Sequence, residues 1–331
     1  MANLPQSLFG SDPPSFSSSS SGAAVPSTSG TNSSTTDHED PSRVYVEKLI
    51  VALRDENTRE CALDLLNKTR ATREDLALLL WHSSETIYTL LKEIVAVYRL
   101  ISNPNLTERQ SNRACNALAL LQCVASHPET RKLFIKAYIP HYLYPLLNIM
   151  NKEKPYEHLR LTSLGVLGAI VKSGDEEAIL FLLESQMFPC CLRCMEVGQE
   201  LSKTVATYIV HNILMKDEGL KYCCAFAQRF YAVDHALRNL LENLAEEPSH
   251  QLLRHIIGCY LRLSQSPRAC DVLRYSLPTR LRDPTIVNLL RDDPTAMGWL
   301  QQLFYNVSNT GQYTTVPTGE LFARLLGGYK G

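Results

Sequence analysis

Four blocks of the sequence share one layout, and this repetition limits the possible folds more than any other feature. Each block contains an apolar helical run with a small residue near its middle, a polar turn with Pro or Asp, and a second apolar run. The turns at Pro128, Asp175, Asp217 and Pro267 are 47, 42 and 50 residues apart, close to the ~40–47-residue period of armadillo and HEAT units. Because one unit alone would leave an apolar face in water, the units must stack. The sequence therefore predicts an all-α fold, an armadillo-repeat right-handed superhelical solenoid of about six repeats.

The two ends of the chain differ in composition from this repeated region. Residues 1–42 contain a Ser/Thr/Gly/Pro tract with too few large apolar groups to offset the entropy lost on ordering, which predicts a disordered arm. The armadillo-repeat domain is expected at 43–306, and a flexible C-terminal tail at 307–331. Four apolar residues of the tail could form a short amphipathic turn: Leu321, Phe322, Leu325 and Leu326.

The charge balance and the cysteine usage limit the function classes. The formal net charge is −1, which argues against a protein that mainly coats nucleic acid or anionic lipid. No basic segment precedes Arg43, and no apolar stretch approaches the ~18–20 residues that span a bilayer. We therefore expect no secretory signal and no membrane partner. Most of the ten cysteines lie in apolar helical runs, which is typical of buried thiols in a reducing compartment.

Two clusters of cysteines are the strongest hint of metal chemistry. Cys191 and Cys194 form a C-x-x-C, and with Cys223 and Cys224 they would supply four thiolates for zinc. However, Cys190 and Cys194 fall on one face of an expected helix, as core residues do, and adjacent cysteines point about 100° apart on a helix. The histidines are scattered, and no paired carboxylates occupy a recognisable frame. We therefore expect no metal, no cofactor and no catalytic residues, and predict that the protein is not an enzyme.

The segment LLLWHSSETIYTLLKEIVAVY, residues 78–98, carries two apolar faces. One stripe recurs at helical spacing and is expected to be buried: Ile87, Leu90, Leu91, Ile94, Tyr98 and Ile101. Tyr88 and Val95 lie seven residues apart on a neighbouring face, beside Trp81 and His82. Either another helix of the same chain or a partner protein covers this second strip.

The later blocks are rich in arginine: Arg229, Arg254, Arg262, Arg268, Arg280 and Arg282. On neighbouring repeats, some of these side chains could share a groove that binds an acidic peptide or phosphates. The alternative is a solvated rim without a ligand.

Long segments of the repeated region are specific enough to indicate a family. They are QSNRACNALALLQCVASHPETR (110–131), LRLTSLGVLGAIVK (159–172), ELSKTVATYIV (200–210) and CYLRLSQSPRA (259–269). Over roughly 43–306 the chain closely resembles the required-for-cell-differentiation family, the armadillo-repeat subunit (subunit nine) of the CCR–NOT mRNA deadenylase complex. The opening MANLP and WLQQLFYNV (299–307) are similar to plant members.

The resemblance implies a non-catalytic adaptor. Family members bind the scaffold subunit of the CCR–NOT complex and display grooves for short linear motifs of mRNA regulators, and they serve mRNA decay, translational repression and transcription regulation. A cytoplasmic location that includes P-bodies, and a nuclear one, are expected on the same basis. The leading alternative is a nucleic-acid-binding transcription regulator that uses the Arg-rich cleft. Weak nucleic-acid binding and a homodimer stay open.

The resemblance also assigns a scaffold-docking segment, whose family pattern is WHSFGTIAALLQEIV. The residues that would carry docking in this chain are Trp81, His82, Ser84, Tyr88 and Val95. Ser84 replaces the Phe of the pattern, Glu85 its Gly and Tyr88 an Ala. The partner surface is therefore expected to have a changed shape here, and docking to be weakened but not abolished.

Two further surfaces are implied by the resemblance. A peptide groove is assigned to His158, Gly165, Leu201 and Val205, and a basic cleft to Arg229, Arg254 and Arg268. A charge at Val205 is expected to abolish peptide binding while folding is retained. His158 replaces a Tyr, and Gly258 falls where the family usually has Arg, which makes the cleft less positive. Ala227 replaces an aromatic residue of a pocket that accepts Trp side chains in animal members, so we do not predict Trp-motif binding.

Overall fold

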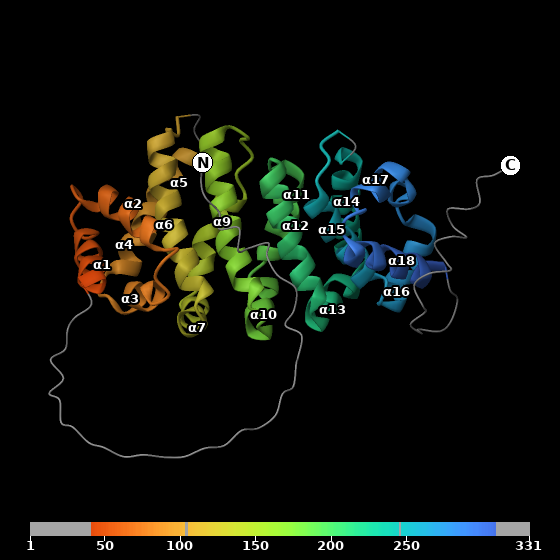
Figure 1. The fold of residues 1–331 in the computed structure, drawn as a ribbon, viewed down its shortest axis with the longest axis horizontal. Helices are drawn as coiled ribbons and strands as arrows, with labels where there is room; N and C mark the ends of the chain where they lie inside the picture. Colours follow the sequence, from red (N-terminus) through yellow and green to blue (C-terminus); the bar gives the residue numbers. More distant parts are fainter. Residues whose placement is uncertain (1–40, 103–104, 245, 309–331) are drawn as a thin grey trace, which may run out of the picture.

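Every regular element in the described part of the chain is a helix. The computed structural model describes residues 41–308, apart from 103, 104 and 245 (Figure 1). In chain order the elements are α1 (Pro41–Ala52), α2 (Arg59–Thr69), α3 (Leu76–His82), α4 (Thr86–Ala96), α5 (Tyr98–Ile101), α6 (Glu108–Ser126), α7 (Pro128–Lys136), the 3-10 helix η2 (Ile139–Leu143), α8 (Tyr144–Leu147), α9 (Lys154–Lys172), α10 (Glu176–Glu184), α11 (Met187–Val197), α12 (Glu200–Met215), α13 (Asp217–Ala225), α14 (Ala227–Asn243), α15 (His250–Leu263), α16 (Pro267–Ser276), the 3-10 helix η3 (Thr279–Arg282), α17 (Pro284–Leu289) and α18 (Pro294–Ser308). Helix α1 begins two residues before the expected domain start and α18 ends two residues after the expected domain end. The rest of the predicted arm and tail, 1–40 and 309–331, lies outside the described residues.

The four turns that define the repeat each separate a long helix from a shorter one. Pro128 and Pro267 are the first residues of α7 and α16, where the missing N–H has no helical partner to lose. The carboxylate of Asp175 accepts a hydrogen bond from the backbone N–H of Glu177 at 3.0 Å and thereby caps α10. Asp217 opens α13, where a negative charge is favourable at the helix N-terminus. Local chemistry at each turn therefore enforces the period seen in the sequence.

The long helices α6, α9, α12, α15 and α18 contact one another in chain order and run through the middle of the molecule (Figure 1). Helix α4 contacts α6 at the start of this series, so the described part of the chain stacks six such helices. The shorter α7, α10, α13 and α16 lie along the lower edge of the view (Figure 1). This arrangement confirms the all-α repeat stack, with about six repeats, that the period predicts.

The core lies in the interfaces between successive repeats, and α9 shows this most clearly. Helix α9 lies between α6 and α12, and its residues from Leu159 to Val171 are buried on every side. Arg160 is fully buried there, paired with Glu157, and its Nη2 donates to the carbonyls of Ile149 and Asn151 at 2.7 and 2.8 Å. These bonds satisfy Nη2 of the buried guanidinium and fix the loop that leads into α9, whereas Nε has no hydrogen-bond partner among the described residues.

The cysteines of α11 occupy core positions. Cys190, Cys191 and Cys194 are all buried, and the Sγ of Cys194 donates to the carbonyl of Leu147 at 3.3 Å. Burial raises the pKa of Cys194 to about 12, so this thiol is protonated at neutral pH. Among the described residues, no group of three or more His, Cys, Asp or Glu could hold a metal ion. In the same part of the chain no single helix is long and apolar enough to cross a membrane, although α10 and α11 reach that length and composition as a pair bent by 77°.

Candidate protein-binding surfaces

The two faces of α4 meet different environments. Leu90 and Ile94 are fully buried, whereas the side chains of Tyr88 and Val95 are 70% and 42% exposed. Within the described residues no helix covers this second strip, which leaves it open to a partner. His82 at the end of α3 is exposed beside it. We call Trp81, His82, Ser84, Tyr88 and Val95 the α3–α4 strip.

The stripe expected to be buried on this segment is only partly so. Ile87, Leu91, Tyr98 and Ile101 are half-buried. Tyr98 and Ile101 also leave the helical period of α4, because α4 ends at Ala96 and these two residues belong to the separate helix α5. Trp81 is likewise packed against the core and not fully exposed. The Tyr98 hydroxyl donates to the carbonyl of Tyr142 at 2.5 Å, and burial raises the pKa of Tyr98 to about 12. A single helical period was the wrong description beyond Ala96.

The turn between α3 and α4 contains two of the departures from the family pattern. Ser84 is exposed, and its carbonyl accepts a hydrogen bond from Nη2 of Arg54 at 3.1 Å. Glu85 has a φ of +64°, in the left-handed region that favours glycine. The position where the family pattern has Gly thus keeps the backbone conformation of a glycine but carries a glutamate.

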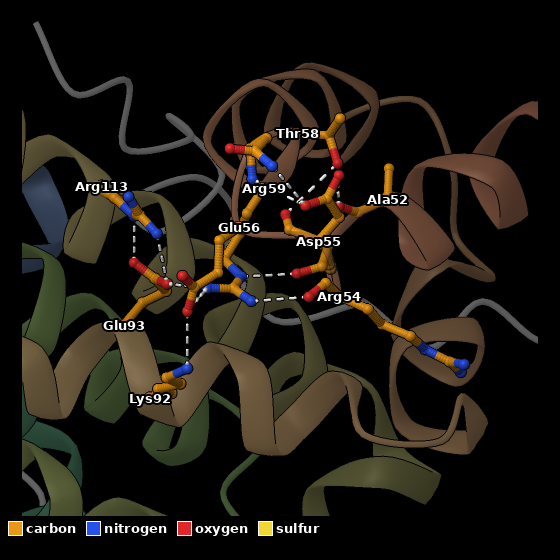
Figure 2. Close-up of polar contacts among 11 residues, drawn as sticks. Ala52, Arg54, Asp55, Glu56, Thr58, Arg59, Lys92, Glu93 and Arg113 are labelled. Carbon is orange, nitrogen blue, oxygen red and sulfur yellow. Dashed lines mark hydrogen bonds and ion pairs between the residues drawn. The ribbon is translucent and has the colours of Figure 1, made fainter.

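A buried ion-pair network holds α4 in place behind the strip (Figure 2). Glu93 of α4 is only 6% exposed and accepts from Nη1 of Arg59 at 3.2 Å and from Nη2 of Arg113 at 2.9 Å. Arg59 also donates to the carbonyls of Leu53 and Arg54 at 2.7 and 3.0 Å. The hydrogen bond to Glu93 raises the pKa of Arg113. The network therefore ties α2, α4 and α6 together, and removing one partner of such a buried pair typically costs about 3–5 kcal/mol.

Sequence reasoning missed a pocket next to the strip, between α1 and α3. It has a volume of about 490 Å³ and is lined by residues that include Val51, Leu78, His82 and Ser83. Val51 is 59% exposed. His82 belongs to both the pocket and the strip, so the two surfaces adjoin. Three charged residues also line the pocket: Arg43, Glu47 and Asp75. The signal for α1 was weak because its exposed face is set by where α2 packs.

The peptide groove that the resemblance assigns is mostly inside the protein. Gly165 and Val205 are buried, because α12 packs between α9 and α15. Leu201 is 43% exposed and His158 is half-buried, with a pKa lowered by burial. The expectation that a charge at Val205 leaves folding intact was therefore wrong: that charge would enter the core between repeats. Only His158 and Leu201 of this set reach the surface.

The three arginines of the predicted basic cleft have different environments. Arg254 donates from Nη1 to Asp293 at 2.6 Å and lies over the ring of Trp299, so its charge is paired. Arg229 lies over the rings of Tyr222 and Phe226, with its guanidinium carbon 3.8 and 4.8 Å from their centroids. Arg268 is exposed on α16. Arg254 therefore does not share a surface with Arg229 and Arg268, which lie on α14 and α16.

A neutral histidine pair lies beside Arg254. The Nδ1 atoms of His211 and His255 are 3.4 Å apart, between α12 and α15. Burial lowers the pKa of His211 to about 4 and that of His255 to about 3, so neither adds positive charge at neutral pH. A Cβ at Gly258 would lie 2.3 Å from Nε2 of His211, so the glycine makes room for this ring. Where the family usually has an arginine, this chain packs an uncharged imidazole.

A second pocket lies where α14 and α16 begin, and it includes Ala227, the position that the resemblance assigns to a Trp-accepting pocket in animal members. Its volume is about 200 Å³, and its lining includes Ala225, Ala227, Tyr231, Arg268 and Ala269. Small side chains at the ends of three helices leave the space. The resemblance indicates the pocket at Ala227, whereas Ala225 and Ala269 gave no signal, because alanine is equally common in packed interfaces.

Stacked helical repeats of this kind define an armadillo-repeat protein. The structure superposes on a designed armadillo repeat protein with a TM-score of 0.56 at 15% identity, over 79% of this chain and 99% of the other, which is a likeness of fold. The chain itself belongs to the cell differentiation family, Rcd1-like, whose model matches residues 49–307. It is 51% identical over 270 residues to the cell differentiation protein rcd1 of Schizosaccharomyces pombe, covering 82% of this chain and 95% of that relative. It is 47% identical over 251 residues to protein CAF40 of Saccharomyces cerevisiae, covering 76% and 67%.

Proposed function

We propose that this protein is a non-catalytic adaptor subunit of the CCR–NOT mRNA deadenylase complex. It docks on the scaffold subunit and recruits regulators that bear short linear motifs, for mRNA decay, translational repression and transcription regulation. Membership of the Rcd1-like family supports the assignment to the complex. The single structural observation that supports docking is the open α3–α4 strip, which no helix of the described chain covers. A cytoplasmic location that includes P-bodies, and a nuclear one, follow from this role.

The strip is suited to a partner that supplies an apolar helix or loop. Exposed Tyr88 and Val95 each lie one residue from a buried residue of α4, Thr89 and Ile94, which pack the helix against the core, so the surface is rigid. A preformed surface lowers the entropic cost of binding. The neighbouring pocket with Val51 extends the area that one partner can cover. Regulators that carry linear motifs would use other surfaces, such as the exposed Leu201 near the start of α12.

Co-purification tests the proposal directly. The full chain, tagged and expressed at its natural level in cells, should isolate the scaffold and nuclease subunits. Tyr88→Glu places a charge in the strip and should remove both, while Tyr275→Glu on α16 changes an aromatic that is 93% exposed far from the strip and should remove neither. Absence of the scaffold from the wild-type preparation, or equal loss with both variants, rejects docking through the strip.

A second test asks what the changed residues of the strip do. Ser84 lacks the aromatic anchor of the family pattern and Tyr88 adds a ring, and a lost buried aromatic costs ~3–5 kcal/mol. Overpacking adds another ~1–3 kcal/mol. The double change Ser84→Phe with Tyr88→Ala should therefore bind the scaffold segment at least about tenfold more tightly in calorimetry. Weaker binding would mean that Tyr88 is itself an anchor in a shifted interface.

The alternative, a nucleic-acid-binding regulator, predicts a different response to salt. Phosphate binding loses about three to five decades of affinity between 50 and 200 mM salt when six to ten phosphates are contacted. Docking of an apolar partner on the strip should change little over this range. The ion pair of Arg254 with Asp293 and the neutral histidine pair reduce the positive charge that phosphate binding needs. A steep salt slope with the full chain would nevertheless favour this alternative.

A further inference from the structure

The pocket between α1 and α3, at the N-terminal end of the helix stack, has apolar side chains on both helices (Figure 1). Ile50 on α1 is buried and Val51 is exposed, while Leu78 and Leu79 on α3 are half-buried. The volume of about 490 Å³ falls in the ~300–1,000 Å³ range of pockets that hold ligands. A hollow with such walls is therefore a candidate seat for an apolar occupant.

The charged groups that line this pocket already have partners within the chain. Arg43 donates from Nε to Glu47 at 3.0 Å, and Asp75 accepts from Nε and Nη2 of Arg73 at 2.8 and 2.7 Å. The hydrogen bond from Arg73 lowers the pKa of Asp75, so this carboxylate is ionised and paired at neutral pH. Because these charges are matched, the pocket favours an occupant that is apolar and carries no charge of its own.

The N-terminal arm enters the described structure at the edge of this pocket. Helix α1 begins at Pro41, and Arg43 in its first turn lines the pocket. The Ser42 hydroxyl accepts a hydrogen bond from Nη1 of Arg73 at 2.8 Å, and the same guanidinium holds Asp75 at the start of α3. These bonds fix the root of the arm against the α3 side of the pocket.

The arm contains one segment with the properties that the pocket favours. Residues 1–40 include five Leu, Phe or Val side chains, and three of them lie within six residues: Leu4, Leu8 and Phe9. No Asp, Glu, Lys or Arg occurs among residues 1–11. Leu4 and Leu8 are four residues apart, which is the spacing of side chains on one face of a helix. A short amphipathic segment of this kind suits a groove between two helices.

The length of the arm allows this segment to return to the pocket. Phe9 lies 32 residues before Pro41, so the connection spans at most about 106 Å. Because the connection is rich in Ser, Gly and Thr, its root-mean-square length is roughly 30 Å. Since its other end is held at the edge of the pocket, the segment has an effective concentration there on the order of a millimolar.

We propose that residues 4–9 of the same chain dock in the pocket between α1 and α3, with Leu4, Leu8 and Phe9 against its apolar walls. At the effective concentration given above, even weak docking keeps the pocket occupied. A partner confined to α4 would leave the arm in place, whereas a partner that extends over His82 must displace it. The arm is thus an internal competitor at this edge of the α3–α4 strip, and its docking does not depend on the strip's role in the complex.

The experiment uses the full chain and a fluorescent peptide of residues 1–12, followed by anisotropy. Leu8→Ser with Phe9→Ser in the chain removes the internal competitor, so this variant should bind the peptide at least about tenfold more tightly than the wild type does. Phe16→Ser, an aromatic change in the arm outside the segment, is the matched control and should behave as the wild type. Equal binding to wild type and double variant, or no binding to either, overturns the proposal.

A charge placed in the pocket identifies the site. Val51→Glu, added to the chain that carries Leu8→Ser and Phe9→Ser, should weaken peptide binding at least about tenfold, because the charge would have to be desolvated. Tyr45→Glu changes an exposed residue of α1 outside the pocket lining and should leave peptide binding unchanged. Circular dichroism checks that each variant keeps its helix content.

Two outcomes of this second experiment refute the proposal. Equal effects of Val51→Glu and Tyr45→Glu would show that the segment does not bind in the pocket. If exclusion of the peptide by the wild type grows with protein concentration, the arm of a second copy is the occupant, and docking within one chain is refuted.

Discussion

Replacing Glu85 by glycine should stabilise the protein, although it removes a side chain at the edge of the α3–α4 strip. The φ of Glu85 is +64°, where the Cβ of an L residue crowds the following carbonyl at a cost of roughly 1–2 kcal/mol. Glycine relieves this strain but gains freedom in the unfolded chain, which offsets about 0.4–1 kcal/mol. The expected net gain is about 0.5–1 kcal/mol, equivalent to a rise in Tm of roughly 1–4 °C for a chain of this size.

Thermal unfolding of the full chain, followed by circular dichroism, measures this gain against two companion variants. Glu85→Ala loses the charge at the start of α4 but keeps the Cβ, and a charge at a helix N-terminus is itself worth about 0.3–1 kcal/mol. The difference between Gly and Ala therefore contains the strain and the entropy of glycine in the unfolded chain, but not the lost charge. Glu85→Asn should fall between them, because asparagine tolerates the left-handed region better than most residues.

The order Gly, Asn, Ala from most to least stable supports the reasoning. If Glu85→Gly melts no higher than Glu85→Ala, the backbone at this turn is not strained by the Cβ. Because repeat proteins can unfold in parts, hydrogen exchange of the α4 amides should be measured as well. Slower exchange in α4 with unchanged exchange in α12 would locate the gain at the turn.

Three further outcomes follow from burial. Val205→Glu should unfold the protein or lower its stability by several kcal/mol, because the charge enters the core, whereas Leu201→Glu on the exposed face of the same helix should leave the Tm nearly unchanged. The folded pKa values of His211 and His255 are depressed to about 4 and 3, below the ordinary value near 6.5, so the stability they contribute is complete above pH 6.5 and is lost as pH falls towards 4. The free energies of unfolding from urea titrations at pH 7.5 and pH 5 should therefore differ by about 2 kcal/mol for each histidine. Replacing both histidines by Gln should remove this difference. Alkylation of the native protein followed by mass spectrometry should modify the exposed Cys61 first, and rapid labelling of the buried thiols of α11 would contradict the core assignment.

The fold could be predicted because its information is local. Each repeat begins its second helix at a Pro or an Asp, and these residues act through their own backbone and side chain at the helix start. The period between such turns then fixes the number of stacked units. Tyr88 and Val95 could also be recognised as a second apolar strip, because α4 has a single clear core face against which to judge them, but the sequence left open what covers it.

The groove could not be predicted, because it depends on neighbours far away in the sequence. Helix α12 is apolar around most of its circumference, so periodicity cannot tell Val205, which faces another repeat, from a residue at the surface. Arg254 carries no sequence sign that Asp293, 39 residues later, pairs with it. The left-handed conformation of Glu85 was likewise hidden, since a glutamate gives no hint of a positive φ. The misses at Val205 and Arg254 concern contacts between elements, and the miss at Glu85 concerns a backbone conformation that the residue type does not reveal.

Two explanations fit the altered α3–α4 strip: it binds its partner more weakly in the position that the family pattern implies, or it binds the partner in a shifted position. A substitution at Val51 distinguishes these two explanations. The buried network around Glu93 keeps α4 fixed on α2 and α6. The departures from the family pattern at Ser84, Glu85 and Tyr88 therefore change the shape of the surface and not the position of the helix. A partner in the position that the family pattern implies would lie along α4. A partner displaced by the ring of Tyr88 would move over His82 into the pocket beside α1, where Val51 is exposed. If the interface has shifted, Val51→Glu should weaken scaffold binding at least about tenfold, since the charge would have to be desolvated. If the partner instead binds weakly in the position that the family pattern implies, Val51→Glu should leave binding unchanged.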